Sequence, residues 1–309
     1  MENVTLSGLA SQGIELDLSP KSFGAFRDST DIRGDADALR ERMAEDGYLY
    51  LPGYLDRGLV LEARRSVTDR LAGEGLTDPD HLPGEAVARP DSGLRFKPDL
   101  AHDNGPLHRL LYSGRMMEFY ERFLGGQVRH YDFTWMRAVA PGIGTHPHGD
   151  VVFMGRGTHD LYTAWAPLGD VDYEVGGLMV LEGSHRLQSL RDGYLTRDVD
   201  EYCENVPGEA EHASLNPTQF GWRWDGRISD DPVELREQLG GRWLTAEYRA
   251  GDLLTFSAYT IHASLDNRSD RIRLSSDSRY QLASDPVDER WIGEAPVGHG
   301  PAGKRGRIC

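Results

Sequence analysis

The stretch QVRHYDFTWMRAVA, at residues 127–140, decides the fold class of this 309-residue chain. Its aromatic residues at positions 131, 133 and 135 alternate with polar residues at 130, 132 and 134. An alternation with a period of two is typical of a β-strand whose two faces meet different surroundings. We therefore expect residues 127–140 to form a strand and the β-rich part of the chain to begin there.

Further segments with β-strand character follow at residues 147–154, 160–167, 177–181, 243–248, 252–257 and 271–281. Short strands with Gly or Pro between several of them predict a sandwich or a barrel. Residues 186–242 interrupt this core and are rich in Asp, Gly, Pro and Trp, with one helical piece expected near 232–239. A long insertion in a β scaffold usually forms a lid or a binding loop.

Helical patterns dominate the chain before residue 125. We expect helices at residues 35–45, 56–71 and 106–124, and a short strand at 48–51. Asp35 is placed to cap the first helix, and Gly47 to end it. The chain is therefore expected to form one domain over residues 1–309. Its parts are a mostly helical region (1–125), a β core (126–281) that contains the insertion, and a tail (282–309).

The chain is acidic, because 34 Lys and Arg residues stand against 50 Asp and Glu residues, for a formal net charge of −16. Nucleic acids and anionic membranes are poor partners for such a chain, since they require clustered positive charge. No run of 18 apolar residues exists, so no transmembrane helix is expected. Cys203 and Cys309 are the only cysteines and lie far apart in the sequence. They argue against a disulfide scaffold and for a reducing cytoplasm.

The motif THPHGDVV, at residues 145–152, is the strongest chemical signal. His148 and Asp150 are two residues apart on a predicted strand, so both side chains are expected to project to the same face. An imidazole and a carboxylate placed in this way can hold a divalent metal ion, provided that a third ligand comes from elsewhere. His262, which follows the apolar segment 251–256, is the best candidate. The alternative is that His148 and Asp150 form a surface pair and that His262 is a histidine of the core or of a loop.

A second group of polar residues follows His262. In residues 271–281 the positions 273, 275, 277, 279 and 281 are all polar and alternate with a second face that contains Ile272 and Leu274. A polar strand face inside a barrel predicts a polar lumen, where Arg273 needs an anionic partner. The carboxylate of a small ligand fits the guanidinium fork. The alternative is an ion pair between Arg273 and a protein carboxylate such as Asp277.

These residues, together with TAWAPLGD at 163–170, GGLMVLEGSH at 176–185 and EDGYLYLPG at 45–53, resemble the phytanoyl-CoA dioxygenase family. The family consists of Fe(II)- and 2-oxoglutarate-dependent oxygenases on a double-stranded β-helix, or jelly-roll, core. The resemblance therefore implies a mainly β fold with flanking helices. It also implies an enzyme that uses O2 to oxidise a small organic molecule, with release of succinate and CO2. Hydroxylation, or a variant such as desaturation or cyclisation, is favoured over halogenation, because related halogenases lack the carboxylate that Asp150 provides.

The resemblance also assigns roles to residues of this chain. His148, Asp150 and His262 match the iron ligands, and Arg273 matches the partner of the distal carboxylate of 2-oxoglutarate. Contacts to the cosubstrate or to its pocket are implied for Ser264, Trp165, Lys97 and Trp135.

Two other functions remain open at this point. A cupin-type metalloprotein would use His146 and His148 as ligands, although the Glu that usually follows such a pair is missing. A non-catalytic jelly-roll protein would keep the site without using it. The substrate and the oligomeric state are not predicted, but Trp222 and Trp224 of the insertion are candidates for substrate contacts.

Overall fold

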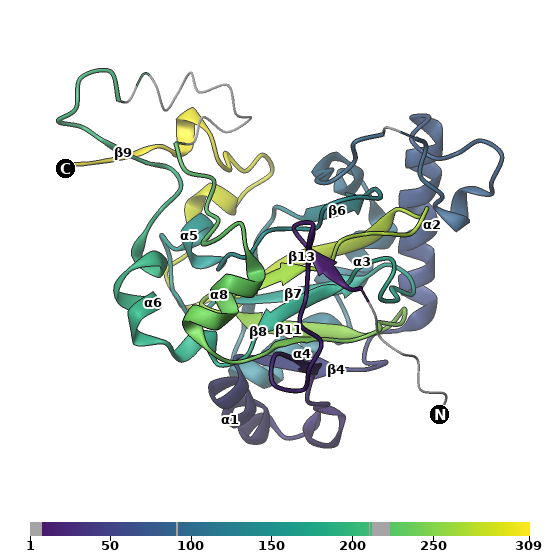
Figure 1. Ribbon diagram of the computed structural model, residues 1–309, viewed down its shortest axis with the longest axis horizontal. Helices are drawn as coiled ribbons and strands as arrows, with labels where there is room; N and C mark the ends of the chain where they lie inside the picture. The colour runs from purple at the N-terminus through teal and green to yellow at the C-terminus, as the bar shows by residue number, and fades with distance from the viewer. Residues whose placement is uncertain (1–7, 91, 210, 212–222) are drawn as a thin grey trace.

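Two β-sheets face each other and form the centre of the molecule (Figure 1). The computed structural model describes residues 8–90, 92–209, 211 and 223–309. The larger sheet has the strand order β4-β11-β7-β13-β5, with β6 also paired to β13, and the smaller sheet has the order β12-β8-β10-β3. All of these pairs are antiparallel except β10 with β3. This is the jelly-roll core that the family resemblance implies.

The strands of the two sheets are β3 (Phe23–Ala25), β4 (Tyr48–Leu51), β5 (Val128–His130), β6 (Trp135–Val139), β7 (Tyr162–Pro167), β8 (Leu178–Leu181), β10 (Trp243–Thr245), β11 (Leu253–Ser257), β12 (His262–Ser264) and β13 (Arg273–Leu282). Two short ribbons lie outside the sheets, β1 (Ala10–Ser11) with β2 (Ile14–Glu15), and β9 (Glu201–Cys203) with β14 (Arg305–Arg307). The α-helices described are α1 (Ala36–Asp46), α2 (Arg57–Gly73), α3 (Gly105–Tyr112), α4 (Arg115–Leu124), α5 (Val151–Met154), α6 (Gln188–Asp192) and α8 (Pro232–Leu239).

The N-terminal helices begin and end close to where the sequence predicts. The side chain of Asp35 accepts hydrogen bonds from the backbone N–H groups of Asp37 and Ala38, and Gly47 ends α1 in the left-handed conformation. The predicted helix over 106–124 is instead two helices, α3 and α4. Gly114, between them, has φ 54° and ψ −132°, a conformation that no α-helix contains and that favours glycine.

The predicted strand over 127–140 is also two elements. β5 pairs with the C-terminal part of β13, at Tyr280–Leu282, whereas β6 pairs with its N-terminal part, at Arg273–Asp277. Tyr131 still bonds to β13 through its backbone N–H and the carbonyl of Arg279. The chain leaves the sheet at Asp132, whose backbone N–H bonds to the carbonyl of Trp291 in the C-terminal tail. A contact with a distant segment therefore interrupts a pattern that is locally continuous.

The larger sheet separates helices α1–α4 from the site. On β7, Ala164 and Ala166 belong to the apolar core that α1–α4 form on the outer face of the sheet. Thr163 and Trp165 alternate with them and face the space between the two sheets. The face of β13 that carries positions 273, 275, 277 and 279 is buried in the same space. The predicted polar lumen is therefore confirmed.

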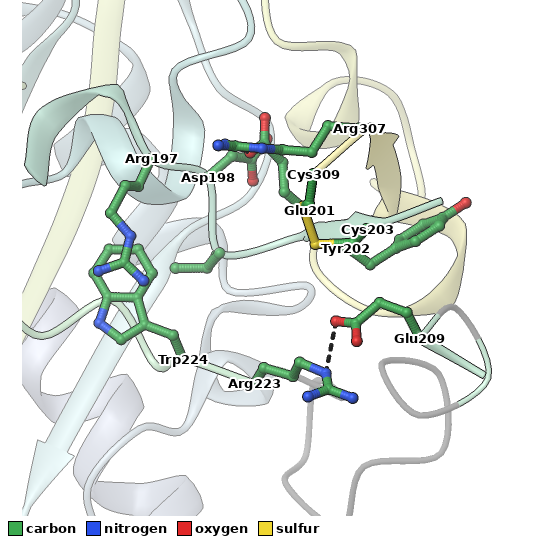
Figure 2. Close-up of a pocket in the computed structure, with 11 residues that line it drawn as sticks. Arg197, Asp198, Glu201, Tyr202, Cys203, Glu209, Arg223, Trp224, Arg307 and Cys309 are labelled. Carbon is green, nitrogen blue, oxygen red and sulfur yellow. Dashed lines mark hydrogen bonds and ion pairs between the residues drawn. A yellow bond between two sulfur atoms is a disulfide. The ribbon is translucent and has the colours of Figure 1, made fainter. Parts of the chain in front are cut away.

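The C-terminal tail contacts the insertion, and this corrects one expectation. Cys203 on β9 forms a disulfide with Cys309, next to the pairing of β9 with β14 (Figure 2). The two cysteines therefore do not stay unpaired, because the fold brings residues 106 positions apart to a Cα–Cα distance of 5.5 Å. Nearby, Asp200 bonds to Arg290 at 2.6 Å and to His299 at 2.8 Å, which further ties the tail to the insertion.

In the part of the chain that the structure describes, no helix has the length and apolar character that a membrane span requires.

Candidate metal centre

Three candidate metal ligands come together between the sheets. His262 lies on β12, while His148 and Asp150 lie in the loop that leads into α5. The predicted strand over 147–154 is wrong. Only His148 pairs with β12, through two backbone hydrogen bonds to His262 of 3.0 and 2.9 Å, and from Asp150 onwards the chain turns into α5. The two side chains therefore converge because the backbone turns between them, and not because of strand periodicity.

The three side chains are buried, and each offers one ligand atom within 4.8 Å of the other two. Asp150 Oδ1 lies 4.0 Å from His148 Nε2 and 3.8 Å from His262 Nε2. Two imidazoles and one carboxylate that leave the other coordination positions open form the ligand set typical of non-haem Fe(II) oxygenases. The donor set thus fits a ferrous ion.

Hydrogen bonds orient both imidazole rings. The Nδ1 atom of His148 lies 2.8 Å from the carbonyl oxygen of His146, and that of His262 lies 3.0 Å from the carbonyl oxygen of Thr260. A carbonyl can only accept, so in each ring Nδ1 carries the proton and Nε2 keeps its lone pair. The Nε2 atoms that keep the lone pairs lie 4.0 and 3.8 Å from Asp150 Oδ1 and are free to bind a metal ion.

Asp150 is held through its second oxygen. Oδ2 accepts hydrogen bonds from the Thr163 hydroxyl on β7 and from Arg279 Nη2 on β13, the latter at 2.9 Å. Thr163 on β7 and Arg279 on β13 are register partners, and both face the lumen. The two donors therefore lie side by side. Oδ1 is thereby left to face the two histidines.

Burial and local charges fix the protonation states. Burial by itself would raise the pKa of Asp150, but the Arg279 guanidinium, together with the hydrogen bond from Thr163, holds that pKa well below its usual value. Burial lowers the pKa of His148 far below 6.5, with a further contribution from His262, and burial also lowers the pKa of His262. At neutral pH the site therefore presents one negative carboxylate and two neutral imidazoles.

A cavity of about 320 Å³ opens onto the centre. His148, Asp150 and Arg279 form its inner end. Its walls are mostly aromatic and apolar, formed by Phe96, Phe133, Trp135, Phe153, Met154, Trp291, Pro296 and Val297. Trp135, a predicted site residue, is part of this wall, and the guanidinium of Arg279 lies 4.2 Å from its ring centroid.

Arg273 lies deeper between the sheets, and its contacts leave one of its hydrogen-bond donors unused. Its Nη1 donates to the carbonyl of Gly176 at 2.7 Å, while its buried Nε has no partner among the described residues. The alternative partner, Asp277, instead accepts from Arg137 Nε at 2.6 Å. Burial, and then the nearby Arg137, lower the pKa of Arg273 to about 10. A buried guanidinium with an unused donor fits the carboxylate of a small anion such as 2-oxoglutarate.

The other predicted site residues fall into two groups. Ser264 and Trp165 are buried between the sheets, where the Ser264 hydroxyl oxygen accepts from the Thr145 backbone N–H at 2.7 Å and Trp165 packs on Tyr248. Lys97 does not line the cavity, and its ammonium pairs with the carboxylates of Glu74 and Asp99.

The insertion and the tail both contribute to the cavity. Asp225 of the insertion and residues 296–299 of the tail belong to its lining. Trp224 does not line it, but stacks under Arg197 and donates to the carbonyl of Arg227, which supports the turn that carries Asp225 (Figure 2). Trp222 lies outside the described residues. Sequence reasoning gave no signal for the tail residues, because only the folded chain brings them to the site.

A second cavity, of about 360 Å³, is larger but lies beside the disulfide, away from the three ligands (Figure 2). Its charged walls are internally paired, Arg223 with Glu209 and Arg307 with Glu201. The candidate metal ligands therefore identify the smaller cavity as the functional site.

Known proteins with similar sequences are described as dioxygenases and hydroxylases. The family model described as phytanoyl-CoA dioxygenase matches residues 43–275. A 1-deoxypentalenic acid 11-beta-hydroxylase of Streptomyces exfoliatus is 28% identical over 269 residues, covering 84% of this chain and 86% of the relative. A protein of the same name from Streptomyces arenae is 27% identical over 277 residues, covering 85% and 87%.

Solved structures share the fold. The non-heme alpha-ketoglutarate-dependent carbocyclase SnoK from nogalamycin biosynthesis superposes with a TM-score of 0.58 at 18% identity, covering 85% of this chain and 90% of that one. EctD from S. alaskensis with bound Fe gives 0.56 at 16% identity, covering 95% and 94%. Because the family model matches well over half of the sequence, the chain belongs to the phytanoyl-CoA dioxygenase family.

Proposed function

We propose that His148, Asp150 and His262 hold the ferrous ion of an Fe(II)- and 2-oxoglutarate-dependent dioxygenase that hydroxylates a small organic molecule. Family membership gives the enzyme class. The observation that carries the residue assignment is the convergence of three buried ligand atoms, two of them on residues that line an aromatic cavity.

When bound, the ferrous ion and 2-oxoglutarate together supply the oxidising power, drawing on O2 and releasing succinate and CO2. The protein supplies binding, orientation and exclusion of water. The two neutral imidazoles and the single carboxylate provide ligands without a prior proton loss. The aromatic walls keep bulk water away from the substrate carbon that faces the inner end of the cavity.

Arg273 is proposed to bind the distal carboxylate of 2-oxoglutarate, with Ser264, Trp165 and Trp135 as further walls or contacts. The unpartnered Nε of Arg273 and its burial support this assignment. Lys97 is the weakest of the proposed contacts, since two carboxylates already neutralise its ammonium outside the cavity.

The hydroxylase names of the two Streptomyces relatives support hydroxylation as the outcome. At 28% identity they support the reaction class and leave the substrate of this chain open. Asp150 agrees with this outcome, because its carboxylate occupies the position that a halide would need. The cupin-type alternative loses its basis, since His146 is not part of the ligand cluster.

We further infer that the whole of residues 1–309 forms one oxygenase domain and that neither nucleic acid nor membrane is a partner, in keeping with the net charge of −16. A cytoplasmic location is also a proposal, and the Cys203–Cys309 disulfide argues against it, because disulfides are rare in reducing compartments.

The proposal is tested by O2-dependent formation of succinate from 2-oxoglutarate in the iron-loaded protein, with and without candidate substrates. The wild type is expected to form succinate slowly alone and faster with a substrate, and His262→Ala is expected to form none. His102→Ala, which changes an exposed histidine far from the ligands in sequence, is the matched control and should keep the wild-type rate. Wild-type succinate formation by His262→Ala would refute the ligand assignment.

A further inference from the structure

Arg137 presents unused hydrogen-bond donors to the cavity. It lies on β6, opposite Ser275 of β13, and its Nε donates to Asp277 Oδ2 at 2.6 Å. Its guanidinium carbon lies 5.9 Å from the ring centroid of Phe96, another residue of the cavity wall. The side chain is 21% exposed, and no described residue accepts a hydrogen bond from its two Nη groups.

The other two arginines between the sheets are placed differently. Arg279 is 2% exposed and its Nη2 is engaged by Asp150. Arg273 is also 2% exposed, and it does not line the cavity. Arg137 is therefore the cavity-lining guanidinium that a molecule entering from solvent can reach, among the residues that the structure describes.

Between the two sheets, arginines outnumber carboxylates. Arg137, Arg273 and Arg279 stand against two carboxylates, Asp150 and Asp277. A ferrous ion and the 2-oxoglutarate dianion add charges of +2 and −2, which cancel.

Asp225, the other carboxylate of the lining, shares Arg227 with the exposed Asp230. Asp225 is bonded to Arg227 through Nε, at 2.8 Å, and through Nη2. Burial lowers the pKa of His299, so its ring is neutral at pH 7. An excess cation beside apolar walls is costly unless an anion accompanies it, and it is unexpected in a chain of net charge −16.

We infer that the substrate is a compact, mostly apolar molecule that carries one carboxylate, and that Arg137 binds this carboxylate through its two Nη groups. This inference rests on the proposed function. The apolar body packs against the aromatic walls, while the Asp277 contact holds the guanidinium in place. Arg137 thereby determines specificity, because a neutral analogue would cover its two Nη groups without offering them the charged acceptor that a carboxylate provides.

The same chemistry could come from the distal carboxylate of 2-oxoglutarate, since Arg137 and Arg273 are close enough to influence each other's charge. We assign the substrate to Arg137 because this side chain lines the open cavity and Arg273 does not. The carboxylate of the substrate and that of 2-oxoglutarate are distinguished by measuring the affinity of the wild type and of the Arg137 variants for 2-oxoglutarate without substrate.

The test compares three ring carboxylates with their isosteric amides: cyclohexanecarboxylate, 1-naphthoate and 1-adamantanecarboxylate. Binding to the Fe(II)- and 2-oxoglutarate-loaded protein is measured without O2, by the change in tryptophan fluorescence from Trp135 and Trp291 in the cavity wall. In the wild type at least one carboxylate should bind about tenfold or more tightly than its amide. Arg137→Gln should lose this preference, Arg137→Lys should keep part of it, and Arg271→Gln, outside the cavity, should keep all of it.

The inference is overturned if no carboxylate in the panel binds more tightly than its amide, or if Arg137→Gln keeps the preference. It is also overturned if Arg137→Gln weakens 2-oxoglutarate binding by the same factor, since the anion at Arg137 would then be the cosubstrate. Failure of the proposed function has a different signature, namely a wild type that binds neither iron nor 2-oxoglutarate. The carboxylate preference is then measured by the same fluorescence on the metal-free protein.

Discussion

The two carboxylate oxygens of Asp150 have different partners, and this difference defines the site at the scale of single residues. Oδ2 is bonded to Thr163 and Arg279, and Oδ1 faces His148 and His262. Loss of a group that orients a metal ligand in this way typically lowers metal affinity by about 10- to 100-fold. Thr163 and Arg279 are therefore expected to be positioning residues for the iron.

Thr163→Val tests this expectation, because valine keeps the shape of the side chain and removes the donor to Asp150. The Kd for Fe(II), measured anaerobically by competition with a chelating dye, should rise about 10- to 100-fold. Thr255→Val is the matched control, since Thr255 is a buried threonine on neighbouring β11 whose hydroxyl contacts Tyr120. An unchanged Kd in Thr163→Val would show that the hydroxyl does not position the ligand.

The sequence allows part of this site to be predicted, and the reason differs by residue. His148, Asp150, His262 and Arg273 stand at recognisable spacings, and the structure brings all four between the sheets. The contact of Thr163 with Asp150 depends on how β7 and β13 pair, which no local pattern specifies.

At the scale of elements, the junction between helix α1 and strand β4 packs closely against the segment that follows β8. Gly47, at the end of α1, has φ +78°, and a Cβ there would collide with the imidazole of His185. Its carbonyl also accepts from the backbone of Ser257 and from the hydroxyl of Thr260, just before His262. Gly47 therefore joins the helical part to the sheet that carries a ligand.

Gly47→Ala is expected to lower the free energy of unfolding by more than the roughly 1–2 kcal/mol that a left-handed non-glycine residue costs, because His185 must also move. Gly53→Ala is the control, since Gly53 has φ +62° and open space around its Cβ position. Urea unfolding of both variants measures the difference. Equal losses would show that the contact with His185 contributes nothing.

The elements that sequence periodicity predicted wrongly share a physical cause. The segments 127–140 and 147–154 both have strand-like patterns, yet contacts from elsewhere interrupt them, with Trp291 in the first case and with β12 and Ala258 in the second. Helices α1 and α2 were predicted closely, because capping and apolar spacing are local properties of the chain.

At the scale of the whole molecule, the C-terminal tail crosses back to the insertion and completes the cavity wall. Residues 296–299 line the cavity, and Cys309 is joined to Cys203 of the insertion (Figure 2). Two cysteines 106 residues apart gave no reason to expect a bond, because only the pairing of β9 with β14 shows that they meet.

Cys309→Ser is expected to lower the free energy of unfolding by about 2–5 kcal/mol, because the disulfide closes a long loop in the unfolded chain. Reducing agent should lower the Tm of the wild type and leave that of the variant unchanged. Alkylation of the unfolded wild type without reductant should modify no cysteine. Two modified cysteines would contradict the disulfide.

The proposed iron and cosubstrate site is tested most directly by anaerobic titration of the Fe(II)-loaded protein with 2-oxoglutarate, followed by its visible charge-transfer band. We predict one iron per chain and a saturable band for the wild type and for Arg271→Ala, whose side chain pairs with Asp172 away from the cavity. Arg273→Ala should keep its iron but require more 2-oxoglutarate, by a factor that corresponds to a few kcal/mol. Asp150→Ala should lose both iron and band. An Asp150→Ala variant with wild-type iron content and a wild-type band would contradict the assignment of the site.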